Sequence, residues 1–458
     1  MASNRPIETD LWLEDLFRPM GALRYEHASF FAGRQQQITE LLAAIRMDGS
    51  APVVYGDRGV GKSSLAFQVF SFLNGGSSAL SENYRKSSYV RGDHSFFWIE
   101  CNERIRNIGD ILLRLLSPSG IEPGHTFVDE FPELVSHEIV ERVSAARNYN
   151  ALFQRHGTSL PDFLRSSDGL SSFRQILSGR TLDPFELFNQ FVSSIFSNHG
   201  GRRLTVFVDE FDRLENKKGV GDFIKNISSI RFVLIGVGET TKDLELDHPS
   251  VERKIQRVFV PPFAEPEVRE IFSIARHKIK HHPNHQKINY SKTFLNSLAR
   301  DCGGYPYLAQ LIGYRIFDRA QVLSRSVESD VDLKQVDYVN GIEQIFSSNN
   351  AIGLMDVGVE LRKAVNQSTR RAAILKALTD FPDTYVSVSN LTDRLEPDKR
   401  RGVHDQLEEL VNAEVLQQSK NDSAQLRFKS PYQKLAVSML YRYKEKFHPA
   451  VLHDFGMA

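Results

Sequence analysis

Short apolar runs alternate with amphipathic stretches over the first half of the chain. The apolar runs have the length of buried strands, are bounded by glycine or polar residues, and lie at 53–55, 95–99, 204–208 and 231–237. The stretches 35–47 and 105–116 instead carry apolar residues at helical spacing. This alternation predicts an α/β fold in which helices cover both faces of a parallel sheet.

Two regions depart from this pattern. Residues 10–30 are rich in aromatic side chains, and we expect them to form a lead segment that packs on the domain behind it. Residues 118–182 mix proline, glycine, serine and charge among short helical pieces, which is typical of an insertion that decorates a core. The composition of this insertion does not indicate its role.

The last third of the chain is predicted to be mainly helical. Helices are expected at 267–280 and 290–300, where they would form a lid, and then at 371–380, 389–395, 399–413 and 431–443, with a hairpin at 415–418 and 425–428. Three helices followed by a hairpin is the order of a winged helix. The predicted domains are a lead segment (1–30), an α/β core (31–262), a helical lid (263–350) and a winged helix (365–446).

Composition narrows the class of protein. The 458 residues include 57 Lys+Arg and 57 Asp+Glu, so net charge gives no argument for nucleic acid or membrane binding. The two cysteines form neither a disulfide framework nor a metal cluster. The start of the chain has no apolar signal core, and no apolar run approaches eighteen residues. We therefore expect a cytoplasmic protein without a membrane segment.

The strand at 53–55 leads into the spacing G-x-x-x-x-G-K-S, from Gly56 to Ser63. Glycines let consecutive backbone N–H groups curl around phosphates, Lys62 can reach the terminal phosphates, and the Ser63 hydroxyl can ligate Mg²⁺. The helix that follows adds its positive dipole end. The predicted nucleotide contacts are Gly56, Asp57, Arg58, Gly59, Val60, Gly61, Lys62, Ser63 and Ser64. The alternative is a glycine turn that binds no ligand.

A second site is predicted where the strand at 204–208 ends in two carboxylates. Asp209 would hold Mg²⁺ through water, and Glu210 would orient and deprotonate an attacking water. The alternative is an exposed acidic strand end, which the apolar run ahead of it disfavours. The strand at 231–237 is followed by Glu239 and Thr240, either of which could contact the terminal phosphate or its water.

These motifs together resemble those of the AAA+ and STAND ATPases, and most closely the archaeal and bacterial initiator-like group. The resemblance covers roughly residues 28–320 without the insertion. It is carried by the phosphate loop, Asp209-Glu210 with its tail at 211–214, the strand tip at 236–240, the stretch 248–253 before a strand at 258–260, and the lead motif at 31–34. It implies a P-loop NTPase with a Rossmann-like sheet, a helical lid and a C-terminal winged helix, which binds ATP and Mg²⁺.

The resemblance also implies roles for residues outside the two motifs. Arg253 stands where such families carry an arginine finger, which stabilises the transferred phosphate across a subunit boundary, so a homo-oligomer is expected in the ATP state. A structural arginine is the alternative, and Arg257 competes for the role. Pro306 resembles the proline of the STAND G-x-P motif, which packs near adenine; a helix start set by proline is the alternative.

The chain departs from the family pattern at two places. It has Glu239 and Thr240 where an asparagine is frequent, and it has no arginine at the start of the lid helix near Pro306. The lid is therefore expected to hold nucleotide for long periods.

We interpret the chain as an ATP-binding, slowly hydrolysing switch whose nucleotide state repositions the winged helix. A signalling or defence scaffold with little hydrolysis is a second hypothesis, and a P-loop kinase is a third.

The winged helix would bind duplex DNA or a protein partner. Its predicted DNA contacts are Lys399, Arg400 and Arg401 at the head of its third helix and Lys420, Arg427 and Lys429 at the hairpin. Asp405, Glu408 and Glu409 on the same helix would repel the DNA backbone if they faced it, so a protein-docking or autoinhibitory module is an equal alternative.

Overall fold

The computed structural model describes residues 11–19, 21–76, 78, 80, 84, 94–103, 105–115, 126–127, 203–217, 220–221, 224, 230–238, 249–347, 354–381, 385–419 and 422–455. The insertion predicted at 118–182 lies outside these residues, apart from Thr126 and Phe127.

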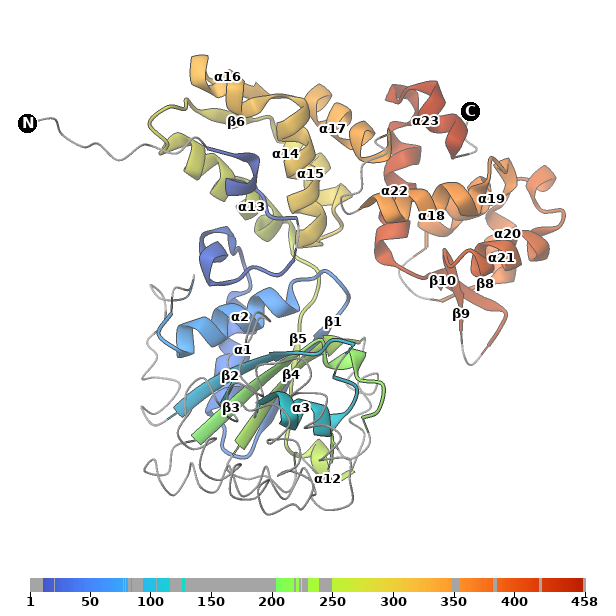
Figure 1. Cartoon of the computed structure of the whole chain (residues 1–458). Coiled ribbons are helices and arrows are strands. Elements are labelled where there is room, and N and C mark those ends of the chain that lie inside the picture. Colours follow the sequence, from blue (N-terminus) through green and yellow to red (C-terminus); the bar gives the residue numbers. More distant parts are fainter. Residues whose placement is uncertain are drawn as a thin grey trace, which may run out of the picture. The chain divides into compact units, whose positions relative to one another are not determined.

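A parallel sheet forms the centre of the first half of the described chain (Figure 1). Its five strands are β1 (Ala51–Gly56), β2 (His94–Glu100), β3 (Arg203–Asp209), β4 (Ile230–Val237) and β5 (Ile255–Phe259). Their order is β2-β3-β4-β1-β5, with parallel pairing throughout. The register pairs Gly56 with Val237 and Asp209 with Glu100. The predicted α/β fold is therefore confirmed, and the loops after four of the strands meet at one edge.

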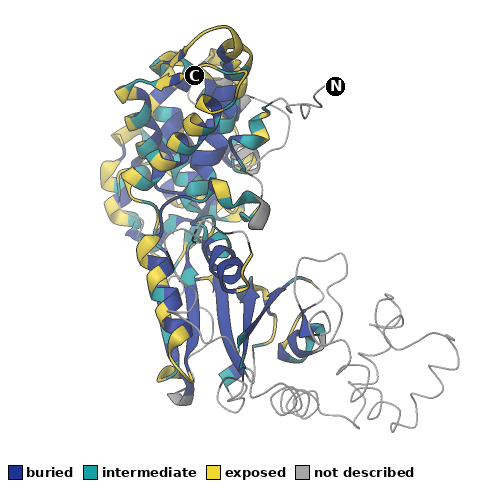
Figure 2. Ribbon diagram, turned by 90° about the vertical axis from the view of Figure 1, so that its left-hand side faces the viewer, coloured by how far each residue is buried: buried dark blue, intermediate teal, exposed yellow. Residues whose placement is uncertain are grey.

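Helices flank this sheet and fix the loops at its edge. They are α1 (Gln35–Arg46), α2 (Lys62–Leu73), α3 (Ile108–Leu115) and the single turn α12 (Pro249–Glu252). The strands β1 to β4 are buried almost throughout (Figure 2), whereas the edge strand β5 is partly exposed. Phe70 of α2 packs on the rings of Trp98 and Phe207, with centroids 5.5 Å away in both cases. Because α2 directly follows the phosphate loop, this packing anchors one end of the loop.

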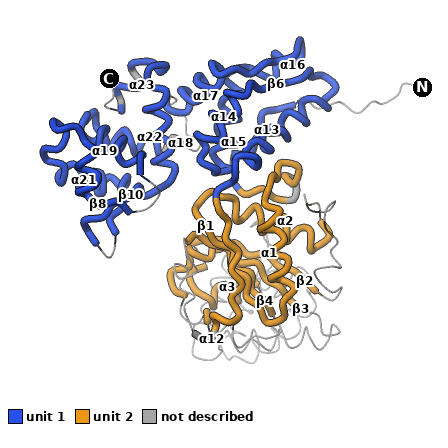
Figure 3. Tube along the Cα trace, turned by 180° about the vertical axis from the view of Figure 1, so that it is seen from behind, with its two compact units in different colours: residues 1–21, 262–458 blue, residues 22–261 orange. Residues whose placement is uncertain are grey.

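The described chain divides into two compact units (Figure 3). One spans 22–261 and contains the sheet; the other combines 1–21 with 262–458. The predicted lead segment is thus split between them. Phe17 is fully buried against Phe272 and Phe317, with centroids 5.2 and 4.8 Å away, so the first part of the segment packs on the helices that follow the sheet.

In the unit that combines 1–21 with 262–458, a group of helices lies where the lid is predicted. Its elements are α13 (Glu265–Lys280), β6 (Ile288–Tyr290), α14 (Lys292–Asp301), α15 (Pro306–Arg319), α16 (Val322–Glu328), β7 (Val331–Leu333) and α17 (Gln335–Ser347). The two short strands pair in parallel. The side chain of Ser291 caps α14 by accepting a hydrogen bond from the Phe294 amide at 3.1 Å. This group is therefore more extensive than the two helices expected from the sequence.

The C-terminal part of this unit contains the helices and the hairpin expected from the sequence, together with a short strand, β8, and two further helices, α18 and α23. Its elements are α18 (Leu354–Val365), α19 (Thr369–Thr379), β8 (Val386–Ser387), α20 (Val388–Arg394), α21 (Val403–Asn412), β9 (Leu416–Gln418), β10 (Gln425–Phe428), α22 (Pro431–Tyr443) and α23 (Pro449–Asp454). The strand β10 pairs antiparallel with both β8 and β9. The strand β8 was not predicted from the sequence, because a strand of two residues leaves no alternating pattern.

One predicted boundary is wrong. The helix expected over 399–413 begins at Val403, because Gly402 precedes it in the left-handed conformation at φ 70°. Lys399 instead ends a 3₁₀ turn that starts at Pro397, and Arg400 and Arg401 follow that turn. The three basic residues therefore precede the helix rather than forming its first turn.

A buried carboxylate connects the lid helices to the C-terminal elements. The side chain of Asp301 is fully buried at the end of α14 and forms ion pairs with Arg300 and with Arg442 of α22. It also accepts hydrogen bonds from the hydroxyls of Tyr338 and Tyr443. Because a buried charge is stable only when it is fully paired, these contacts tie α14, α17 and α22 together.

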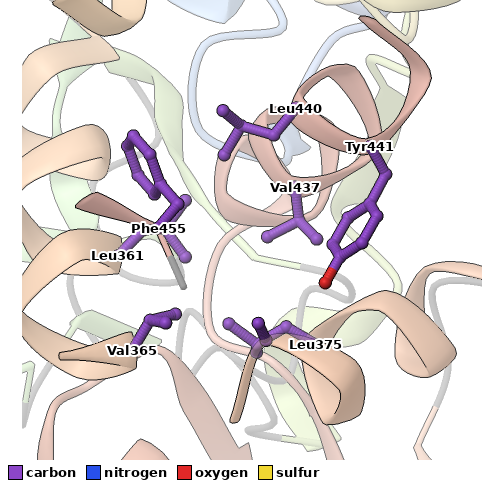
Figure 4. Close-up of a pocket in the computed structure, with 8 residues that line it drawn as sticks. Leu361, Val365, Leu375, Val437, Leu440, Tyr441 and Phe455 are labelled. Atoms are coloured by element: carbon purple, nitrogen blue, oxygen red, sulfur yellow. The ribbon is translucent and has the colours of Figure 1, made fainter. Parts of the chain in front are cut away.

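A small apolar pocket lies between α18, α19 and α22 (Figure 4). Its walls include Leu361, Leu375, Val437 and Phe455, and no charged side chain lines it. It therefore offers no group for catalysis. Among the described residues, no helix is both long and apolar enough to cross a membrane.

Candidate nucleotide-binding site

The glycine-rich stretch after β1 forms a tight loop that ends at the first turn of α2. Gly56, Gly59 and Gly61 have φ values of 151°, 79° and 95°, a region in which residues with a side chain are strained. A Cβ atom on Gly56 would lie 2.4 Å from the Val260 carbonyl oxygen. The loop therefore needs these glycines, and it leads directly into the N-terminal end of α2, where helices favour anions.

Lys62 is the first residue of α2, and its side chain folds back over the loop. Its Nζ donates hydrogen bonds to the carbonyls of Gly56 at 3.0 Å and Asp57 at 2.7 Å. Burial lowers the pKa of Lys62 to about 8, although nearby carboxylates, led by that of Asp212, oppose the shift. The ammonium group thus lies within the loop, where an added phosphate would favour its charged form.

Ser63 and Asp209 bring the two predicted motifs together. The Ser63 hydroxyl donates to Asp209 Oδ1 at 2.9 Å, and the same oxygen accepts from the Glu210 amide at 2.9 Å. Asp209 is only 3% exposed, and burial raises its pKa to about 7, against the effect of these hydrogen bonds. A buried carboxylate beside a hydroxyl is a set of hard oxygen donors that suits Mg²⁺. The two residues therefore fit the metal that the sequence predicts.

Glu210 has an uncommon backbone conformation. Its φ is 53°, in the left-handed region. This conformation costs a residue other than glycine about 1–3 kcal/mol, and residues that adopt it are found most often at functional sites. Its side chain is 33% exposed and forms an ion pair with Arg213 at 2.8 Å. Burial is the main cause of the raised pKa of Glu210. The backbone amide of Glu210 thus contacts Asp209, while its carboxylate pairs with Arg213 and is partly exposed to solvent.

The end of β4 completes this edge of the sheet. The Val237 amide donates to Asp212 Oδ1 at 2.8 Å, and the Gly238 amide donates to the Gly56 carbonyl at 3.3 Å. These contacts confirm that the third predicted strand lies beside the phosphate loop. Glu239 and Thr240, predicted at the tip, lie outside the described residues.

Arg253 lies at the opposite edge of the sheet. It occupies the exposed turn between α12 and β5, and the Ala51 amide at the start of β1 donates to the neighbouring Lys254 carbonyl at 2.7 Å. The phosphate loop begins at the other end of β1, about five residues or roughly 17 Å further along. Arg253 therefore cannot reach the loop of its own sheet. Arg257 forms an ion pair with Glu252 at 2.6 Å, whereas Arg253 has no ion pair within the described part of the chain.

Two other predicted contacts have structural roles of their own. The Ser64 hydroxyl accepts from the Leu23 amide at 2.9 Å, so it holds the lead segment rather than facing the loop. Pro306 is the first residue of α15, and a Cβ atom on the preceding Gly304 would lie 2.4 Å from the Phe263 carbonyl oxygen. Pro306 belongs to the compact unit that does not contain the sheet, so its proximity to adenine stays a prediction.

The sequence analysis missed three charged residues near this site. Arg34 is 2% exposed and donates to the Val60 carbonyl within the loop at 2.6 Å. Arg24 forms an ion pair with Glu100 at 2.7 Å, at the end of β2. The glycine-arginine pair before α1 is a sequence signal for Arg34, but the Arg24–Glu100 pair joins residues 76 positions apart and follows no local pattern.

Several basic residues were predicted to contact DNA. Most of those that the structure describes have partners within the C-terminal elements. Arg400 donates to the carbonyls of Leu395 and Asp393, at 2.9 and 3.1 Å, and so caps the end of α20. Lys429 pairs with Glu414 at 3.0 Å, Lys399 pairs with Asp398 at 3.2 Å, and Arg427 lies 4.7 Å from the Tyr385 ring centroid. Arg401 is exposed, and Lys420 lies outside the described residues.

The exposed face of α21 is acidic. It carries His404, Asp405, Glu408, Glu409 and Asn412, whereas Val403, Leu407 and Leu410 are buried on the other side. The helix that would enter the major groove in a DNA-binding winged helix thus presents three carboxylates. The negative charge of this face would repel the phosphate backbone of DNA.

The fold and the site together define a class. A phosphate loop follows β1, two adjacent carboxylates follow β3, and β4 lies between these two strands, which makes the core a P-loop NTPase fold. The predicted fold class is thereby confirmed.

Searches for similar proteins found matches only among solved structures. They include a Walker-type ATPase of Pyrococcus abyssi (15% identity, 92% of this chain and 99% of that chain, TM-score 0.46). A second match is the ORC1 protein of Aeropyrum pernix in complex with DNA, with 13% identity over 90% of this chain and 93% of that chain and a TM-score of 0.40. A third is the RuvB Holliday junction branch migration motor of Thermotoga maritima, with 14% identity over 91% of this chain and 96% of that chain and a TM-score of 0.36. No family model and no curated protein matches. The roles of individual residues are therefore argued from this chain alone.

Proposed function

We propose that the chain is a magnesium-dependent ATPase of low turnover that acts as a nucleotide switch. The hydrogen bond from Ser63 to the buried Asp209 is the observation that carries this proposal, because it places a loop hydroxyl and a carboxylate where a phosphate-bound Mg²⁺ needs them. The loop amides and Lys62 would hold the phosphates. When bound, Mg²⁺ supplies charge stabilisation to the phosphoryl oxygens.

Glu210 is proposed as the general base. Its carboxylate is one residue beyond Asp209 and is partly exposed, so a water molecule can reach it. The ion pair with Arg213 keeps the side chain oriented, and a positioned carboxylate that accepts the water proton contributes about 10²–10⁴-fold to the rate. The lid has no arginine at the start of α15 near Pro306, which is our reason for proposing slow turnover.

We further propose that ATP brings two copies of the chain together. Arg253 is exposed at the sheet edge remote from its own phosphate loop, so it suits the site of a neighbouring copy rather than its own. A guanidinium at the transferred phosphate is a strong source of rate enhancement in phosphoryl transfer. The proposed active unit is therefore a homo-oligomer, with Arg253 supplied in trans.

The C-terminal elements α19 to β10 are proposed to form a winged helix that the nucleotide state repositions. Residues 368–446 contain 14 Lys+Arg and 11 Asp+Glu, so net charge alone would allow DNA binding. The acidic exposed face of α21 and the internal partners of Arg400 and Lys429 instead favour docking to a protein. We also propose that the protein is located in the cytoplasm.

Phosphate release from ATP by purified protein tests the proposal. We expect slow Mg²⁺-dependent release in wild-type protein and loss of ATP binding in Lys62→Ala. Tight ATP binding without release would instead favour the nucleotide-sensing scaffold. Release of ADP without inorganic phosphate, in the presence of an acceptor, would indicate a kinase.

A further inference from the structure

A short stretch of the lead segment is fastened to the helix that follows the phosphate loop. The Leu23 amide donates to Ser64 Oγ, and Gln68 Nε2 lies 3.4 Å from the carbonyl oxygens of Leu23 and Arg24. The guanidinium of Arg24 lies 5.0 Å from the Phe67 ring centroid. These contacts fix Arg24 along α2, within the same compact unit as the site.

The partner of Arg24 is a third carboxylate at the edge of the sheet. Arg24 forms an ion pair with Glu100 at 2.7 Å, and the two side chains are 21% and 33% exposed. Glu100 is the last residue of β2 and is the direct register partner of Asp209 on β3. Neighbouring strands lie about 4.8 Å apart, so the negative charge of Glu100 lies beside the proposed magnesium ligand.

We propose that Arg24 is a positioning residue of the nucleotide site, which neutralises Glu100 and holds it away from the magnesium ion and the phosphates. This inference rests on the proposed function. An unpaired carboxylate beside Asp209 would repel the phosphates and compete with them for the metal. The lead segment therefore has a role in nucleotide binding through charge, in addition to its packing.

Four proteins test this role: wild type, Arg24→Gln, Glu100→Gln and the double variant. Their dissociation constants for ATP are measured by calorimetry, with Mg²⁺ and with EDTA, and their thermal midpoints are recorded. We expect Arg24→Gln to weaken binding of ATP with Mg²⁺ about five- to tenfold, on the order expected for one uncompensated charge in a partly solvated site. Glu100→Gln should restore the affinity in the double variant, because it removes the charge that Arg24 offsets.

A matched control is available at the other edge of the sheet. Arg203 of β3 forms an ion pair with Asp48, remote from the loop. Arg203→Gln should leave the affinity for ATP at the wild-type value, whatever its effect on the thermal midpoint. This separates a local electrostatic effect from a general loss of stability.

The outcomes distinguish this inference from the proposed function. A double variant as weak as Arg24→Gln would show that Arg24 acts by packing, and unchanged binding in Arg24→Gln would show no role; either overturns the inference alone. Weakened binding in Glu100→Gln by itself would also overturn it, because Glu100 would then contribute to binding. Wild-type protein that binds no ATP would overturn the proposed function as well.

Discussion

Ser63 donates its hydroxyl hydrogen to Asp209 at 2.9 Å, although the two residues are 146 positions apart in the chain. The strand order explains this contact, because β4 joins β1 to β3 and places their carboxyl ends at one edge. Two motifs that the sequence shows separately are thereby brought within hydrogen-bonding distance of each other.

This pair predicts a specific response to metal removal. EDTA should weaken ATP binding in wild-type protein, whereas Ser63→Ala and Asp209→Asn should bind ATP weakly with or without Mg²⁺, because the first removes an oxygen ligand and the second removes the negative charge of the carboxylate. Calorimetry with and without EDTA measures this dependence. Ser64→Ala is the matched control, since its hydroxyl accepts from Leu23 and its loss should leave the effect of Mg²⁺ intact. Full Mg²⁺ dependence in Asp209→Asn would contradict the assignment.

The lowered pKa of Lys62 predicts a loss of ATP affinity at high pH. Only the charged amine pairs with phosphate, and its pKa in the nucleotide-free protein is about 8. Affinity should be full at about one pH unit or more below 8, fall to roughly half at pH 8, and above that decline toward about tenfold per pH unit, the limit for one proton. The stability of the nucleotide-free protein should shift the other way. Because the folded pKa is below the ordinary value of 10.5, this group contributes a rise in stability as pH increases between the two.

ATP titrations at constant Mg²⁺ and ionic strength, from pH 7 to about 10, measure this effect. An affinity for ATP that stays constant over this range would show that Lys62 remains charged or does not contact the phosphates.

The exposed position of Arg253 predicts complementation between two inactive variants. Arg253→Ala and Glu210→Gln should each hydrolyse ATP poorly, and their mixture should regain part of the activity, because one mixed interface keeps both groups intact. Arg257→Ala is the control; it breaks the ion pair with Glu252 and should remain active. If the mixture stays inactive while both variants assemble, Arg253 does not act in trans.

The acidic face of α21 predicts that duplex DNA binds weakly at most. Fluorescence anisotropy of a labelled duplex, measured at several salt concentrations, should show no binding at physiological salt. Replacing both Asp405 and Glu408 with Lys should create salt-dependent binding, because it reverses the charge of the exposed face. Wild-type affinity with a log–log salt slope near about −4 to −5, reduced in Arg401→Glu, would indicate four to six phosphate contacts and restore the DNA assignment.

Local patterns in the sequence were sufficient to predict the sheet and both nucleotide motifs. The loop from Gly56 to Ser63 and the pair Asp209-Glu210 each lie within a few residues, directly after apolar strands. Their positions directly after apolar strands follow from local spacing, and the parallel sheet then brings them together.

Features that depend on backbone geometry or on distant pairing were not predicted. The basic residues at 399–401 were expected in a helix, because nothing in their composition shows that Gly402 takes φ 70° and delays its start. The ion pair between Arg24 and Glu100 depends on how the lead segment lies along α2, and no short-range pattern encodes that. The helical group at 265–347 was underestimated because its short parallel strands interrupt the helical periodicity.

Single-turnover hydrolysis in Glu210→Gln tests the central claim most directly. The account predicts that this variant binds ATP with near wild-type affinity but hydrolyses it at least about a hundredfold more slowly, the scale for losing a general base. Radiolabelled ATP bound to excess protein with Mg²⁺ would be followed to ADP and phosphate. Hydrolysis at the wild-type rate in Glu210→Gln, with binding intact, would contradict the account.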